Sequence, residues 1–159
     1  MVLLEPLNRY EDYLVHTLAD GASIVCEVGS PGVALTADTY HMSVEETRIG
    51  EAIKANAELI GHVQLGDSNR LEPGNGHYDW ADTLDALIDI DYDGWLAMEC
   101  GLSGTADEVL PDVARLLRRA GAQSGVAVPN ACRTDSEERT TTLRPLIVAP
   151  QAQRENQPA

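Results

Sequence analysis

A short apolar run, a polar loop and a stretch with helical spacing follow one another four times in this chain. The apolar runs cover residues 2–4, 33–35, 60–65 and 95–98, and the helical stretches cover roughly residues 9–28, 44–58, 79–90 and 105–120. Strands that alternate with helices are typical of parallel βαβ units with right-handed crossovers. The order therefore predicts an α/β fold with four parallel strands.

The number of these units limits the architecture. A complete (β/α)8 barrel needs about 250 residues, and four units supply about half of that. An open four-stranded α/β layer is the plainest interpretation. The polar residues at the strand ends, described below, favour half of a TIM (β/α)8 barrel instead.

The two helical stretches nearest the carboxyl end have the clearest signals. In residues 105–120 one face is apolar and is made of Val109, Leu110, Val113, Leu116 and Leu117. Such a stripe is typical of a helix that packs on a core. Asp79 precedes the other stretch and is a predicted N-cap.

The pattern ends near residue 121. Residues 122–159 are rich in Ser, Thr, Pro, Gln and Arg and contain one short apolar run, residues 146–148. Such a composition cannot bury enough apolar surface to order the chain. We therefore expect one domain over residues 1–120 and a mostly disordered tail over 121–159.

Charge and composition exclude some functions. Asp and Glu total 26 against 11 Lys and Arg, and the net charge of −15 disfavours binding to nucleic acid. No apolar run reaches the roughly 18 residues of a membrane span, and the amino terminus lacks a secretory signal. Three widely spaced cysteines do not suggest a disulfide framework, so a cytoplasmic protein is expected. The acidic, lysine-poor surface fits a halophilic source about as well as an ordinary one.

Each apolar run leads to a side chain that can bind a cation. These are Glu5, Asp38, Gln64 and Glu99, and the intervals between them are 33, 26 and 35 residues. In a parallel barrel such positions converge at the carboxyl-terminal face, where active sites lie. Three carboxylates and an amide oxygen suit Mn²⁺, Mg²⁺ or Co²⁺. Spacing alone does not separate a metal site from ordinary polar strand ends.

Five local segments resemble one enzyme family in order and in register. They are Glu5-Pro-Leu-Asn-Arg-Tyr-Glu11, Ala37-Asp-Thr-Tyr-His-Met-Ser-Val-Glu-Glu46, Gly61-His-Val-Gln-Leu-Gly-Asp-Ser-Asn-Arg70, Pro73-Gly-Asn-Gly76 and Tyr92-Asp-Gly-Trp95 with Glu99. They are similar to the xylose-isomerase-like TIM-barrel superfamily of sugar isomerases and epimerases. The similarity is greatest to ketose 3-epimerases of the tagatose/psicose type, with hydroxypyruvate isomerase next. It covers only the last four βα units of those enzymes.

The resemblance implies roles for individual residues. Glu5, Asp38, Gln64 and Glu99 resemble the metal ligands, and Glu5 and Glu99 also resemble the acid/base pair. The residues that resemble contacts to substrate hydroxyls are Glu11, His41 and Arg70.

One position departs from the epimerase pattern. The epimerases have histidine where this chain has Gln64, whereas hydroxypyruvate isomerases have glutamine there. This departure bears on the substrate more than on the metal. His62 lies on the same strand face as Gln64 and is a possible alternative ligand.

The resemblance implies metal-dependent isomerisation or epimerisation of a ketose or related hydroxy-ketone through an enediolate, with one divalent ion, Mn²⁺ before Mg²⁺ or Co²⁺. The main alternative is a truncated, non-catalytic remnant or a metal-binding half-barrel that needs a partner. Apurinic-endonuclease-like activity is a weaker alternative because the charge opposes DNA. Open edges on a half-barrel predict a homo-oligomer or a separately encoded amino-terminal half as partner.

Overall fold

The sheet is parallel throughout, and its strands follow chain order. The computed structural model describes residues 1–123 and 147–148. The strands are β1 (Val2–Leu4), β2 (Val33–Asp38), β3 (Ile60–Leu65), β4 (Leu96–Met98) and β5 (Ile147–Val148), in the order β1-β2-β3-β4-β5. Every neighbouring pair is parallel. The predicted α/β fold with four parallel βα units is confirmed, and the described strands form an open sheet.

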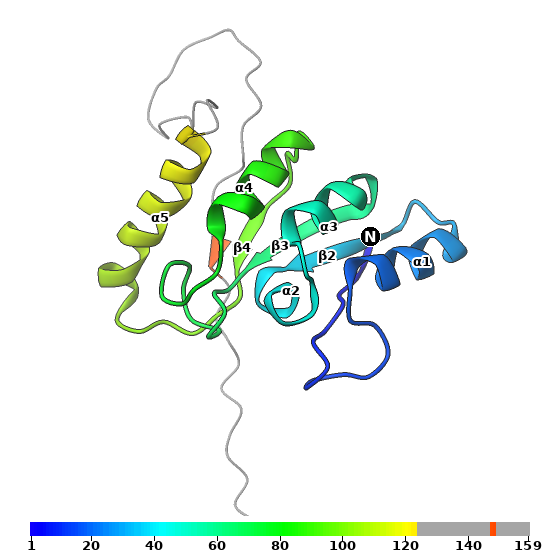
Figure 1. The fold of residues 1–159 in the computed structure, drawn as a ribbon, viewed down its shortest axis with the longest axis horizontal. Helices are drawn as coiled ribbons and strands as arrows, with labels where there is room; N and C mark the ends of the chain where they lie inside the picture. The colour runs from blue at the N-terminus through cyan, green and yellow to red at the C-terminus, as the bar shows by residue number, and fades with distance from the viewer. Residues whose placement is uncertain (124–146, 149–159) are drawn as a thin grey trace, which may run out of the picture.

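Helices form a layer beside this sheet (Figure 1). The helices of this layer are α1 (Leu18–Val28), α3 (Ile49–Ala55), α4 (Trp80–Asp89) and α5 (Ala106–Gln123). α1 contacts α3, α3 contacts α4, and α4 contacts α5. Two further elements, α2 (Thr39–Glu45) and the 3-10 turn η1 (Ala57–Leu59), also lie between β2 and β3 in the chain. Among the described residues, no helix is long and apolar enough to cross a membrane.

The core lies between the sheet and the helix layer. Leu35 and Val63 from the strands and Ile53, Leu84 and Leu87 from the helices are fully buried. Burying a side chain of this size contributes about 1.5–3 kcal/mol. This packing fixes the strands and therefore the positions at which they end.

The edge strand β1 is much less protected. Val2 is 66% exposed and Leu3 is 41% exposed. Among the described strands β1 has a single neighbour, β2. One apolar edge of the sheet therefore faces solvent.

The first helix is shorter than its predicted range, residues 9–28. Residues 9–17 form a loop, because Asp12 accepts the backbone N–H groups of Tyr13 and Leu14 and so ends any helical turn there. α1 begins only after Thr17, which forms a capping box with Asp20. The polar side chains of this segment bond to the local backbone and compete with the helix.

The second predicted helix, residues 44–58, is not continuous: it takes in the end of α2, all of α3 and the start of η1. Asp38 caps α2, which the apolar pattern did not indicate, and the chain becomes extended at Glu46 before α3 begins. α3 then ends at Ala55. The apolar pattern could not indicate the start of α2, because α2 begins at the N-cap Asp38, a carboxylate at the end of β2.

The two later helices agree with prediction. Asp79 accepts the backbone N–H of Asp82 and caps α4. Val113 of α5 is buried, and the other residues of the predicted apolar face pack against the core. The apolar periodicity was sufficient here, and α5 continues past Pro111, which lies inside it.

The predicted disordered tail, residues 121–159, contains structure at two places. α5 continues to Gln123, and Ile147 and Val148 pair with Ala97 and Met98 of β4. A β-branched apolar pair readily adds to a free strand edge. Residues 124–146 and 149–159 lie outside the described residues.

The cysteines agree with the expectation of no disulfide framework as far as they are described. Cys26 and Cys100 are free thiols. Cys132 lies outside the described residues.

Candidate active site

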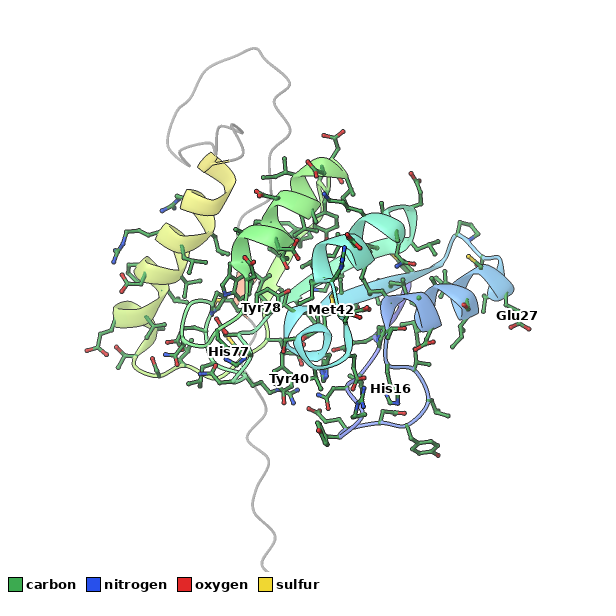
Figure 2. All side chains as sticks on the ribbon, viewed as in Figure 1. His16, Glu27, Tyr40, Met42, His77 and Tyr78 are labelled. Carbon is green, nitrogen blue, oxygen red and sulfur yellow. The ribbon has the colours of Figure 1, made fainter. Side chains whose placement is uncertain are left out.

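The four residues with metal-ligand spacing lie along one edge of the sheet. Glu5 directly follows β1, Asp38 ends β2, Gln64 is the next-to-last residue of β3, and Glu99 directly follows β4. Asp38 and Gln64 are register partners, and the backbone N–H of Glu99 donates to the carbonyl of Leu65 at 3.1 Å. The parallel register therefore brings all four to the carboxyl-terminal edge. His16 of the β1–α1 loop, Tyr40 of α2 and His77 of the loop after β3 lie along the lower side of the molecule in Figure 2.

Three of the predicted site residues form a close group. Ligand atoms of Glu5, Asp38 and His41 lie within 4.8 Å of one another. The Nε2 atom of His41 lies 3.7 Å from Oε1 of Glu5. Asp38 accepts the backbone N–H of His41 at 3.1 Å, and this is the bond that caps α2. The cap therefore holds His41 beside both carboxylates.

Gln64 joins Glu99 to this group. Its Nε2 donates to Oε2 of Glu99 in a very short contact. Its Oε1 is buried and meets no hydrogen-bond donor among the described residues. A buried acceptor without a partner costs about 1–3 kcal/mol, and a cation at this position would remove that cost.

Burial and neighbouring negative charge perturb the carboxylates. Burial, followed by the charge of Glu99, raises the pKa of Glu5 to about 7. Burial raises the pKa of Asp38 to about 7 against the lowering effect of the hydrogen bond from the backbone of His41, and the charges of Glu5 and Glu99 raise it further. Burial lowers the pKa of His41. A divalent cation would favour the ionised form of both acids.

These residues fit a hard divalent ion. The donors are carboxylate oxygens and one unpartnered amide oxygen, which suit Mn²⁺ or Mg²⁺ better than structural zinc. The charge supplied by Glu5, Asp38 and Glu99 is concentrated where the strands end. The unpartnered Oε1 of Gln64 is the observation that decides the fit.

The alternative ligand His62 lies deeper in the sheet. Its register partner is Thr36, whereas Gln64 pairs with Asp38 one layer nearer the edge. His62 is not a member of the close group formed by Glu5, Asp38 and His41.

The remaining predicted residues form one rim of the site. Arg70 makes an ion pair with Glu11, and its guanidinium carbon lies 4.7 Å from the ring centroid of Tyr40. The backbone of Arg70 is in the left-handed region, with φ of 60°. The guanidinium of Arg70, in the loop after β3, thereby contacts both the loop after β1 and helix α2.

A family model described as a xylose isomerase-like TIM barrel matches residues 1–120. The chain belongs to this family.

Curated relatives in this TIM-barrel family are sugar epimerases. The D-psicose 3-epimerase of Enterocloster bolteae is 44% identical over 96 residues, which cover 60% of this chain and 32% of the relative. The 3-dehydro-D-guloside 4-epimerase of Escherichia coli is 37% identical over 99 residues, which cover 62% and 38%. The chain thus spans about a third of the length of these curated relatives.

A solved structure supports the same fold. Apo 3-keto-D-glucoside 4-epimerase from E. coli superposes with a TM-score of 0.71 at 33% identity. The superposition covers 75% of this chain and 46% of that chain. Partial coverage is expected for four βα units of a barrel that has eight.

Sequence reasoning missed the residue that shapes the rim of this xylose isomerase-like site. Asp67 is fully buried and accepts hydrogen bonds from the indole of Trp80 at 2.9 Å and from the backbone of Gly74 at 2.8 Å and Tyr78 at 3.1 Å. Burial alone would raise the pKa of Asp67, but these bonds hold it below its usual value. The backbone N–H of Arg70 donates to the Asp67 carbonyl at 2.8 Å. A carboxylate two residues after a buried strand was the available signal.

Proposed function

We propose that residues 1–120 carry the metal-binding and acid/base residues of a divalent-metal-dependent ketose epimerase. The observation that carries this proposal is the buried, unpartnered oxygen of Gln64 beside the strand-end carboxylates. The relatives named above support a sugar epimerase. Because the chain spans about a third of their length, the activity of the whole protein is part of the proposal.

Four residues would hold the ion: Glu5, Asp38, Gln64 and Glu99. We favour Mn²⁺, with Mg²⁺ and Co²⁺ as alternatives, because the donors are hard oxygens. When bound, such an ion acts as a Lewis acid toward the carbonyl and hydroxyl oxygens of a ketose and stabilises developing negative charge.

Glu5 and Glu99 would carry out the proton transfer. One carboxylate would remove the proton from the carbon beside the carbonyl, giving an enediolate, and the other would return a proton on the opposite face. With a divalent cation bound, Glu5 would be ionised and so able to accept a proton. The two residues follow β1 and β4, so they approach the site from different strands.

Substrate hydroxyls would be bound by Glu11, His41 and Arg70. The ion pair of Arg70 and Glu11 presents donors and acceptors side by side, which suits a polyol. D-psicose and L-ribulose are the first ketoses to test, because relatives act on sugars of these names.

The test compares carboxylate-to-amide variants for binding and turnover. Mn²⁺ binding is measured by calorimetry, and epimerisation of D-psicose and L-ribulose is followed by chromatography. Glu99→Gln should abolish both, because it removes a charged ligand and a base. Glu27→Gln is the matched control, since Glu27 lies at the far end of α1 (Figure 2). Turnover that survives both a chelator and Glu99→Gln would refute the mechanism.

A second candidate is a metal-binding half-barrel that needs a partner for catalysis. The open sheet and the exposed edge of β1 favour it. Mn²⁺ binding that is lost in Glu99→Gln, together with no turnover in the unmodified protein, would distinguish this candidate from an active epimerase.

A further inference from the structure

Asn8 lies in the β1–α1 loop and is almost completely buried, with 1% of its surface exposed. Its backbone N–H donates to Nδ1 of His41 at 3.1 Å. Its side-chain Nδ2 lies 2.9 Å from the same ring nitrogen. Two nitrogen atoms of Asn8, one from the backbone and one from the side chain, therefore lie within hydrogen-bond distance of Nδ1 of His41.

The orientation of the Asn8 amide is fixed independently of His41. The backbone N–H of Tyr10 donates to Oδ1 of Asn8 at 3.0 Å, so Oδ1 must be the oxygen. The Nδ2 group, on the other side, also donates to Glu11 at 3.3 Å. Both Asn8 atoms that face His41 are consequently donors.

A ring nitrogen that accepts hydrogen bonds cannot carry a proton. In a neutral imidazole the proton then resides on the other nitrogen. For His41 this is Nε2, the atom 3.7 Å from Glu5. A protonated ring nitrogen has no free lone pair, so it can donate to an oxygen but cannot bind a metal.

We propose that Asn8 is a positioning residue that holds His41 in the Nε2–H tautomer. His41 then serves the site as a hydrogen-bond donor and not as a third metal ligand, although it lies within 4.8 Å of ligand atoms of Glu5 and Asp38. That the donor meets a sugar oxygen rests on the proposed function. The tautomer itself does not.

The first experiment records the ¹⁵N resonances of the imidazole rings in the full chain, with His41→Gln to assign His41. We expect an unprotonated, pyridine-type Nδ1 and a protonated, pyrrole-type Nε2. Addition of Mg²⁺ should leave Nε2 protonated. A protonated Nδ1, or loss of the Nε2 proton on Mg²⁺ addition, would overturn the proposal. A chain that binds none of Mn²⁺, Mg²⁺ and Co²⁺ in calorimetry would contradict the proposed function and leave the tautomer assignment standing.

The second experiment changes the side chain of Asn8. Asn8→Asp replaces the donor by a carboxylate that accepts a proton from Nδ1, so the Nδ1 resonance should shift to the protonated type. Asn56→Asp is the control with the same chemistry, because the Asn56 amide donates to the Ala52 carbonyl in α3. An unchanged His41 tautomer in folded Asn8→Asp would show that the backbone N–H of residue 8 is sufficient to hold the tautomer, and would refute a positioning role for the Asn8 side chain. If that variant does not fold, the spectra of the unmodified chain still decide the tautomer.

Discussion

At the scale of single residues, Gln64 distinguishes this site. A neutral amide stands where the resemblance leads one to expect histidine, and its oxygen is buried without a partner. An amide oxygen favours hard ions, whereas imidazole favours ions such as Co²⁺. The choice of side chain at this position should therefore set the metal preference.

We predict that Gln64→His increases the affinity for Co²⁺ relative to Mg²⁺. The physical reason is the exchange of an oxygen donor for a nitrogen donor at an otherwise unchanged site. Calorimetric titration of both ions into both proteins measures the ratio. An unchanged ratio would show that Gln64 is not a ligand.

Glu45 gives a prediction about pH. The bidentate ion pair with Arg9 links the β1–α1 loop to α2, and the Glu45 side chain is only 3% exposed. Hydrogen bonds from Arg9 lower the pKa of Glu45 from 4.5 to about 2. A lowered carboxylate pKa contributes stability that is fully present above the unfolded pKa and is lost as pH falls through the folded one.

The difference in free energy of unfolding between the natural chain and Glu45→Gln should thus be constant above about pH 5 and shrink as pH falls toward about 2. Urea unfolding across this range provides the measurement, with Glu27→Gln as the baseline variant. A difference that grows on acidification would mean that the ion pair does not stabilise the fold.

At the scale of elements, the loop after β3 depends on Asp67. We predict that Asp67→Asn lowers the free energy of unfolding by about 1–3 kcal/mol. The carboxylate of Asp67 accepts several hydrogen bonds with both of its oxygens, whereas the amide of asparagine has one oxygen that accepts and one NH₂ group that donates. Asp79→Ala, which removes only the cap of α4, should cost about 1 kcal/mol. An unchanged free energy of unfolding in Asp67→Asn, measured by urea unfolding, would show that Asp67 does not organise the loop.

The limits of a helix or strand could be predicted from the sequence where apolar periodicity defines them, and could not where a hydrogen bond from a polar side chain does. β3 and α4 follow from apolar runs and a single cap at Asp79, so their predicted limits agree with the structure to within one residue. The start of α1 depends on Asp12 and Thr17, and α2 depends on Asp38, so apolar periodicity could not find them. Asn8 has no sequence signal because its role requires α2 to be placed beside it.

At the scale of the whole molecule, the outer edges of β1 and β4 differ. β5 covers the edge of β4, whereas the edge of β1 has no neighbour among the described strands. Backbone groups on such an edge readily pair with another chain. The net charge of −15 opposes that association, and salt screens the repulsion.

We predict that the chain self-associates through β1 and does so more strongly in multimolar salt. Light scattering after size-exclusion chromatography measures the mass at low and high salt. Val2→Lys should shift the population toward monomer, because a charge on an edge strand opposes pairing. Val28→Lys, on the exposed end of α1, is the control. A stable monomer of the natural chain in both salts would refute the prediction.

The consecutive strand order also bears on how the chain folds as it is made. Each of the first four strands pairs with the next one along the chain, so most of the loops that must close are short. Synthesis from the amino terminus can therefore add one βα unit at a time onto a surface that is already formed. Glu5 and Asp38 meet early, Gln64 follows, and Glu99 arrives last with β4. Until that fourth unit docks, the growing chain has a partial set of acidic ligands and cannot hold the ion as the finished site would.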